Sequence, residues 1–252
     1  MIPFTLNSQN QDHPRIFLNC VYRLGGLERV DTTQKVIYLT FTGGDYNDGS
    51  KTVLKTLKGE KVIANFFLTG DFLRNKKNKK FVKRLVSYGH YLGPHSDKHL
   101  LYASWTNRDS LLVSKDSFNI DLSNNYNMLE KFGVHKKDAL FFMPPFEWYN
   151  QQISNWTADF GSILVNYSPG TRSNADYTTP DMGDRYLSSE QIIKSILNYE
   201  SSSTSGMNGF ILLLHIGTHP DRTDKLYNRL DELIQILRER GYQFRLLAEV
   251  LN

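Results

Sequence analysis

Seven short apolar segments recur along the chain, separated by polar segments with helical periodicity or by loops. The apolar segments are KVIYLTF (35–41), KVIANFFL (61–68), HYLG (90–93), ALFFM (139–143), SILVNY (162–167), GFILLLHI (209–216) and YQFRLL (242–247). They are apolar on both faces, which is typical of parallel strands covered by helices. The pattern therefore predicts an α/β fold, a distorted (β/α) barrel of about seven parallel strands.

The segments between these strands favour the same architecture. In DKLYNRLDELIQILRERG, the apolar side chains of residues 230–237 fall on one helical face, and Gly241 ends the helix. No G-x-G-x-x-G motif follows the first strand, so a nucleotide-binding open sheet fits less well than a barrel. We expect one barrel domain over residues 35–252, preceded by an N-terminal extension or cap over residues 1–34.

Composition narrows the possible classes of protein. The net charge of +4 is small, and the basic run RNKKNKK (74–80) has no interleaved aromatic residues. We therefore expect a solvated helix end or loop there and no nucleic-acid partner. Cys20 is the only cysteine, which excludes an intramolecular disulfide and a four-thiolate metal site. No segment reaches the ~20 apolar residues of a membrane span, so no transmembrane segment is expected.

Functional side chains of a barrel stand at the C-terminal ends of its strands, and the first and third predicted strands end in such residues. TGGDYNDGS follows the first strand, where glycines free the backbone to turn and Asp45 and Asp48 supply carboxylates. HSDKH sets His95 and His99 four residues apart, which would face both imidazoles the same way on a helical turn. Two histidines and a carboxylate commonly bind a hydrolytic divalent metal ion. An ordinary turn with surface or core histidines is the alternative.

The segment FILLLH ends in His215 at the same predicted face of the barrel. A histidine at the end of a buried strand can act as a general acid, and a hydrogen-bonded core histidine is the equal alternative. His219 is expected at a loop surface. SPGTRSNADYTTPDMGD (168–184) is rich in turn-forming residues and predicts a long loop over the mouth of the site.

Taken together, these motifs resemble those of the polysaccharide deacetylases of the nodulation-protein type, carbohydrate esterase family four. That family carries T-F-D-D-G, H-[ST]-x-x-H, R-x-P-x-G, a D-x-x-D-W-like segment and a late L-x-H. HSDKH and LLH fit the second and last motifs without change, while TFTGGDYNDG, MPPFE and VNYSPGTRSNAD occupy the other three places in order. The resemblance covers about residues 35–252.

The resemblance implies a single metal ion, usually zinc, held by one Asp and two His. The metal would polarise an acetyl carbonyl and activate a water molecule. On this basis Asp45, His95 and His99 are the predicted metal ligands, Asp48 is the predicted base and His215 the predicted general acid. The roles of Asp45 and Asp48 can be exchanged.

The third motif implies the substrate-binding residues, which are Pro145, Phe146, Glu147 and Trp148. The backbone N–H of Phe146 would contribute to an oxyanion hole. Glu147 and Trp148 would shape a sugar-binding groove, with Trp148 either a stacking platform or an ordinary packing residue.

Three positions depart from the family pattern. Thr42 and Gly43 stand where the family has its Asp-Asp pair, and Met143 replaces the motif-three Arg that orients the base. Arg172, on the loop after the next strand, is predicted to supply that positive charge from another direction.

The resemblance implies a metal-dependent hydrolase that removes acetyl groups from acetylated sugars of a poly- or oligosaccharide. The altered first and third motifs favour one alternative, a non-catalytic carbohydrate-binding relative. A metal amidohydrolase acting on a small non-sugar amide is a third hypothesis. An acetylated carbohydrate substrate further implies a secreted or periplasmic bacterial protein.

Overall fold

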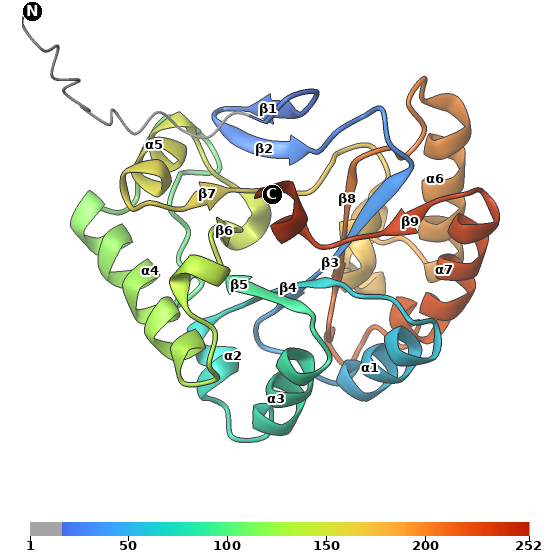
Figure 1. The fold of residues 1–252 in the computed structure, drawn as a ribbon, viewed down its shortest axis with the longest axis horizontal. Helices are drawn as coiled ribbons and strands as arrows, with labels where there is room; N and C mark the ends of the chain where they lie inside the picture. Colours follow the sequence, from blue (N-terminus) through green and yellow to red (C-terminus); the bar gives the residue numbers. More distant parts are fainter. Residues whose placement is uncertain (1–16, 252) are drawn as a thin grey trace, which may run out of the picture.

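The computed structural model describes residues 17–251, in which strands and helices alternate (Figure 1). The strands are β1 (Val21–Arg23), β2 (Gly26–Arg29), β3 (Val36–Gly43), β4 (Asn65–Leu68), β5 (Tyr91–Pro94), β6 (Phe141–Phe142), β7 (Ile163–Leu164), β8 (Phe210–His215) and β9 (Gln243–Phe244). The α-helices are α1 (Ser50–Gly59), α2 (Gly70–Arg74), α3 (Lys79–Ser87), α4 (Lys115–Glu130), α5 (Gln151–Asp159), α6 (Ser189–Ser202) and α7 (Leu230–Glu239). All seven predicted strands are present as β3 to β9, and the β1–β2 hairpin precedes them.

The central strand of the sheet is β3, which pairs in parallel with β4 on one side and β8 on the other. β5 continues the sheet beyond β4, and β9 pairs with the first residues of β3. β6 and β7 form a separate parallel pair. The N–H of Met143 donates to the Pro94 carbonyl at 3.2 Å, and the N–H of Asn166 donates to the Leu27 carbonyl at 2.8 Å. These bonds connect β6 to β5 and β7 to β2, while β2 pairs antiparallel with β8. The predicted distorted barrel is confirmed, with β2 as its antiparallel member.

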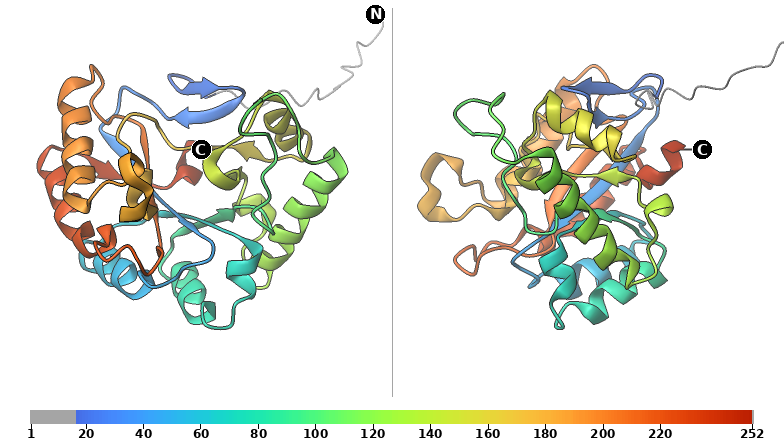
Figure 2. Two further views of the ribbon diagram at one scale, coloured as in Figure 1. Left: turned by 180° about the vertical axis from the view of Figure 1, so that it is seen from behind. Right: turned by 90° about the vertical axis from the view of Figure 1, so that its left-hand side faces the viewer.

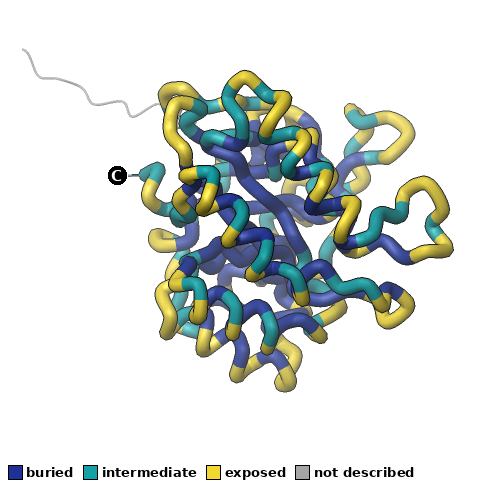
Figure 3. Tube along the Cα trace, turned by 90° about the vertical axis from the view of Figure 1, so that its right-hand side faces the viewer, coloured by how far each residue is buried: buried dark blue, intermediate teal, exposed yellow. Residues whose placement is uncertain are grey.

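Side chains along β3 and β8 point alternately toward the helices and into the barrel. Ile37, Leu39 and Phe41 belong to the larger apolar cluster that includes the helices. Tyr38 belongs to a second, smaller cluster inside the barrel. The same alternation directs Thr42 inward, opposite its register partner His215. Figure 3 shows the strands buried within a shell of half-buried and exposed helices and loops.

The two ends of the barrel differ. The C-terminal 3-10 helix Leu247–Leu251 lies at one end, where Leu247 is fully buried. Long loops, including residues 101–113 and 171–188, project from the other end, as the right-hand view of Figure 2 shows. Because β9 pairs with the start of β3, the projecting loops stand at the C-terminal ends of the strands.

The boundary between cap and barrel at residue 34 stays a prediction, because residues 1–16 lie outside the described range. Residues 26–29 form β2, so this part of the predicted cap contributes a strand to the barrel. Within residues 17–251, the structure contains no helix that is both long and apolar enough to span a bilayer.

Candidate active site

A cavity of about 960 Å³ opens at the C-terminal ends of the strands. Its wall comes from the segments that follow β3, β5, β6 and β8 and from the long loop 171–188. The predicted site residues that line it are Asp45, His95, His99, Phe146, Glu147 and His215. The structure therefore brings all three predicted histidines to one cavity.

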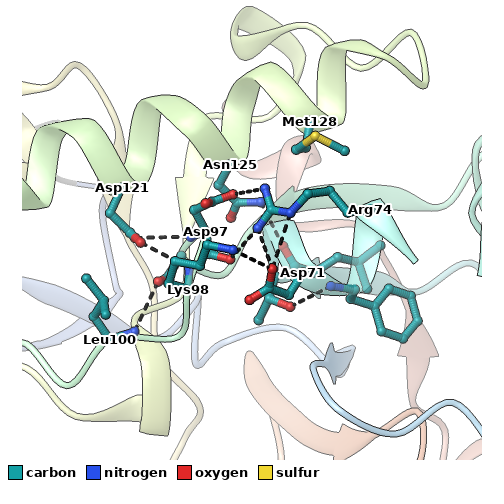
Figure 4. A network of polar contacts seen from close by, with 12 residues as sticks. Asp71, Arg74, Asp97, Lys98, Leu100, Asp121, Asn125 and Met128 are labelled. Carbon is teal, nitrogen blue, oxygen red and sulfur yellow. Dashed lines mark hydrogen bonds and ion pairs between the residues drawn. The ribbon is translucent and has the colours of Figure 1, made fainter. Parts of the chain in front are cut away.

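A buried polar network holds the segment that follows β5 (Figure 4). Asn125 on α4 accepts a hydrogen bond from the N–H of His95 at 2.8 Å. Asp121, one helical turn earlier, accepts from the N–H of Asp97 and from the next N–H, both at 3.0 Å. Arg74 on α2 donates to the Asp97 carboxylate at 2.6 Å. These contacts fix the backbone that carries the two histidines.

The prediction of a helical turn at HSDKH is wrong. Residues 95–99 form a bend in which Ser96 and His99 have positive φ angles of 71° and 54°. The bonds from α4 impose this shape, which spacing alone does not reveal. The rings of His95 and His99 nevertheless lie together, with centroids 5.1 Å apart.

His95 is almost fully buried, and its Nδ1 lies 2.9 Å from the Met143 carbonyl. Because a carbonyl oxygen can only accept, Nδ1 carries the proton and Nε2 keeps its lone pair. Burial lowers the pKa of His95, and the nearby His99 and His215 lower it further. Burial also lowers the pKa of His99. Both imidazoles are therefore neutral at neutral pH.

His215 is paired with a carboxylate that the sequence did not single out. Asp176, in the 3-10 turn Ser173–Tyr177, lies with Oδ1 2.6 Å from His215 Nδ1, and its Oδ2 accepts the His215 N–H at 2.8 Å. Burial alone would lower the pKa of His215, but Asp176 reverses the effect and the pKa is raised. Asp176 therefore holds the proton on Nδ1 and leaves Nε2 for chemistry.

Glu147, predicted to shape a sugar-binding groove, is more deeply buried than that role requires. Its side chain is 11% exposed, and its Oε1 is 3.9 Å from His95 Nε2. Burial raises the pKa of Glu147 to about 7. Phe146 and Glu147 both have positive φ angles, 60° and 53°, and this pair of left-handed residues directs the carboxyl into the cavity.

Asp48 does not line the cavity. Its Oδ1 accepts from the N–H of Thr218 at 2.9 Å, and its Oδ2 accepts from the Tyr227 hydroxyl at 2.6 Å and lies 3.0 Å from Lys225 Nζ. Burial alone would raise the pKa of Asp48, but these three partners lower it overall. The carboxylate thus ties the loop after β3 to the segment after β8.

Arg172 and Pro145 also stand outside the cavity wall. The Arg172 side chain is exposed and donates to the Arg185 carbonyl at 3.0 Å. Pro145 is buried and opens the turn that carries Phe146. The cavity wall includes Arg185 in place of Arg172.

Trp148 packs beside the cavity and does not line it. Its Nε1 donates to the Ser104 carbonyl at 3.2 Å, and the Arg108 guanidinium lies 3.8 Å from its ring centroid. Trp148 supports Trp105, whose ring centroid is 5.1 Å away. Of the two alternatives for Trp148, a stacking platform or an ordinary packing residue, its contacts fit the second. Trp105 is 55% exposed and lines the cavity, so it presents an aromatic face there.

The mouth of the cavity has further aromatic groups. Phe146 is 42% exposed and packs on His99, with ring centroids 4.3 Å apart. His219, expected at a loop surface, is half exposed and lines the rim against Tyr46. The rim is therefore suited to flat, partly apolar faces such as those of sugar rings.

The donor groups fit a metal ion only in part. A histidine whose Nδ1 is fixed by a carbonyl and whose Nε2 is free matches the usual second-shell arrangement of a metal ligand, and a neutral imidazole is what ligation requires. However, within residues 17–251 no three His, Cys, Asp or Glu side chains are grouped so that they could hold a metal ion. A third donor is not in place.

The missing donor corresponds to the altered first motif. Thr42 stands inside the barrel with its Oγ1 buried and without a hydrogen-bond partner among the described residues. A Cβ at Gly43 would lie 2.8 Å from side-chain atoms of Leu68 and Ile216. The surroundings of Gly43 must therefore shift before this position can carry any side chain.

Buried histidines and carboxyl groups at the C-terminal ends of barrel strands define an enzyme-like (β/α) barrel. Within that class the chain belongs to the polysaccharide deacetylase family, because the sequence profile of this family matches residues 29–164. This match confirms the resemblance that the histidine motifs indicated. The nodulation-protein subfamily stays a prediction.

Two curated relatives and one solved structure are similar to the chain. It is 24% identical to the peptidoglycan-N-acetylmuramic acid deacetylase of Bacillus subtilis, over 98% of this chain and 83% of that one. It is 27% identical to a peptidoglycan-N-acetylglucosamine deacetylase of Bacillus cereus, over 88% of this chain and 91% of that one. The crystal structure of a Bacillus anthracis pseudoenzyme of carbohydrate esterase family four superposes with a TM-score of 0.69 at 20% identity, covering 92% of this chain and 70% of that one.

Proposed function

We propose that the protein removes acetyl groups from acetylated sugars of a poly- or oligosaccharide in the cavity described above. One observation carries this proposal: the His215–Asp176 pair and the buried pair His95 and His99 share a single cavity. The named activities of the two peptidoglycan deacetylase relatives support a glycan substrate. For such a substrate we also propose a location in the periplasm or outside the cell.

The chain's own side chains supply acid chemistry and sugar binding. The raised pKa of His215 favours its protonated form, whose Nε2 can donate a proton to the leaving group. Trp105 and Phe146 offer exposed aromatic faces against which a sugar ring can pack. In this proposal the backbone N–H of Phe146 is a donor to the acetyl oxygen.

The proposed cofactor is a divalent metal ion, zinc, with His95 and His99 as ligands and Asp45 as the third. Asp45 lines the same cavity, and its charge acts on His99, but its carboxylate would have to move closer to the two histidines to complete the site. Bound there, zinc would polarise the acetyl carbonyl and lower the pKa of a water molecule. Asp48 and Arg172 are the proposed base and orienting charge, and each would have to leave its partner outside the cavity to act there.

The altered first motif favours a second candidate function, non-catalytic carbohydrate binding. Thr42 and Gly43 carry no carboxylate where the family has two. A protein of this kind would bind the glycan through Trp105 and Phe146 without releasing acetate. The Bacillus anthracis pseudoenzyme of similar fold supports this candidate.

Metal content and acetate release separate the two candidates. We expect about one zinc per chain in the wild type, lost in His95→Ala and retained in His135→Ala, which changes an exposed histidine outside the cavity. His215→Ala is expected to keep the metal and to lose acetate release from acetylated oligosaccharides by a factor of about 10²–10⁴. A wild type that binds such sugars, refuses added zinc and releases no acetate would establish the second candidate.

A further inference from the structure

Positive charge is concentrated in one part of the chain. Residues 51–90 hold eleven of the 30 Lys and Arg residues but two of the 26 Asp and Glu residues, a net charge of +9. Since the whole chain has a net charge of +4, the remainder carries −5. The two acidic residues of this segment already form ion pairs. Glu60 pairs with Arg238 at 2.8 Å, and Asp71 pairs with Arg74 at 2.6 Å.

Six of these cations line one groove between α1 and α3, which lie side by side in Figure 1. The groove has a volume of about 380 Å³, and among residues 17–251 no acidic residue lines it. Its cations are all exposed and come from α1 (Lys51, Lys55, Lys58) and from α3 and the turn before it (Lys77, Lys80, Arg84). We call this feature the α1–α3 groove.

The cations of the α1–α3 groove lack partners of opposite charge. None of the six forms an ion pair with any residue in the range 17–251, although other cations of the chain do. Like charges that face one another across a groove repel, and the repulsion is relieved when an anion enters. The groove therefore favours a ligand with several negative charges in a row.

The shape of the groove indicates what kind of anion fits. It is a hollow between two helices, with Leu54 and Phe81 among its lining residues and Tyr88, 42% exposed, also in its wall. Lys58 Nζ lies 5.5 Å from the Tyr88 ring. A hollow of this kind with an exposed aromatic ring suits a sugar chain, whereas a flat lipid surface is met by protruding cations.

The groove also adjoins the catalytic cavity. Asn47 and Ser50 line the α1–α3 groove, while Asp45 and Tyr46, on the same loop after β3, line the cavity. A chain bound in one site can therefore continue toward the other.

We propose that the α1–α3 groove binds an anionic polysaccharide, a glycan chain whose sugars carry negatively charged groups. This inference rests on the glycan-directed function proposed above, and it adds a second site that holds the polymer while the cavity acts on an acetylated sugar. The site is electrostatic, so its affinity falls as the salt concentration rises.

Two variants with the same change in net charge test the groove. The groove variant carries Lys51→Gln, Lys55→Gln and Lys80→Gln, and the control variant carries Lys131→Gln, Lys137→Gln and Lys194→Gln, exposed lysines elsewhere. Binding of fluorescent polygalacturonate is measured by anisotropy at low salt and in 0.5 M NaCl, with neutral dextran as a second probe. We expect the groove variant to lose affinity by about tenfold or more and the control by less than about twofold, with wild-type binding weakened by salt.

Several results would overturn this proposal. Equal losses in the two variants would show a general charge effect, and tighter wild-type binding to anionic lipid vesicles or to RNA than to polygalacturonate would assign the groove to another partner. Equal binding of dextran would remove the electrostatic basis. Because binding is read without turnover, failure of the deacetylase proposal is seen separately, as absent acetate release by the wild type on a neutral acetylated oligosaccharide. The groove variant is expected to release acetate from that short substrate as the wild type does.

Discussion

Replacing Asp176 by Asn tests how the cavity holds His215. Asp176 is 3% exposed, and its two carboxylate oxygens bind the Nδ1 and the backbone N–H of His215. Asparagine has nearly the same size and can keep one oxygen on the backbone N–H. Its NH₂ group then faces Nδ1, so the variant loses one hydrogen bond and the negative charge that stabilises the protonated imidazole.

The expected loss follows from the burial of the pair. A hydrogen bond to a charged group contributes about 1.5–3 kcal/mol, so D176N should lower the free energy of unfolding by about that amount at mildly acidic pH. The pKa of His215 is raised above its ordinary value of 6.5 in the folded protein. The pair's contribution is therefore fully present below 6.5 and is lost as the pH rises through the folded pKa. The stability difference between variant and wild type should narrow at alkaline pH.

Urea unfolding at one pH below and one pH above the folded pKa of His215 measures the loss in the free energy of unfolding. NMR titration of His215 reports its pKa directly. Without Asp176, burial dominates, so the pKa of His215 in the variant should fall below the ordinary value. Asp181→Asn is the matched control, because Asp181 lines the same cavity and is exposed. The reasoning is refuted if D176N is as stable as D181N at every pH, or if His215 keeps its raised pKa in D176N.

Two further predictions concern Asp48 and His90. Asp48→Asn removes the charge that binds Lys225 and weakens the bond from Tyr227, so thermal unfolding should show a loss of about 1–2 kcal/mol. Unchanged stability would contradict the structural role, and a loss of acetate release by a factor of about 10²–10⁴ at a temperature where the variant is fully folded would support Asp48 as the base. Burial lowers the pKa of His90 to about 4 from 6.5, and its Nδ1 accepts from the Ala64 N–H at 3.2 Å. Between pH 6.5 and 4 the unfolded chain therefore binds a proton that the folded protein does not, and stability falls by about 2–3 kcal/mol as the pH drops. His90→Gln keeps an acceptor and should flatten this acid dependence in urea unfolding, and an unchanged slope would assign it to other groups.

The barrel could be predicted because its strands are apolar on both faces. This pattern can be read from each segment by itself, without knowing its contacts with residues far away in the sequence. β3 and β8 show this most clearly, with buried residues along nearly their whole length. The positions of His95 and His215 followed from the rule that barrel strands direct their C-terminal ends to one face. These inferences needed local sequence and topology, and nothing more.

The loops were beyond such reasoning because their shapes depend on partners far away in the sequence. Turn-forming residues predict that a loop turns, but not that Asp176 reaches His215 across 39 positions. Asp48 is held by Tyr227, 179 positions away, so its loop sequence alone could not show that its carboxylate is engaged. The depth of Glu147 depends on two left-handed residues that are not glycine, and composition gives no signal for these.

The two neighbours of β3 in the sheet are translated at very different times. β4 begins at Asn65, soon after β3, but β8 begins only at Phe210 and supplies six register partners to the other edge of β3. At five to twenty residues per second, the ribosome needs on the order of 10–30 s to make the roughly 170 residues between them. During that interval β3 presents an apolar, unpaired edge, the kind of surface that pairs with other chains. The segment of β3 therefore stays without its β8 partner until nearly the whole chain has been made.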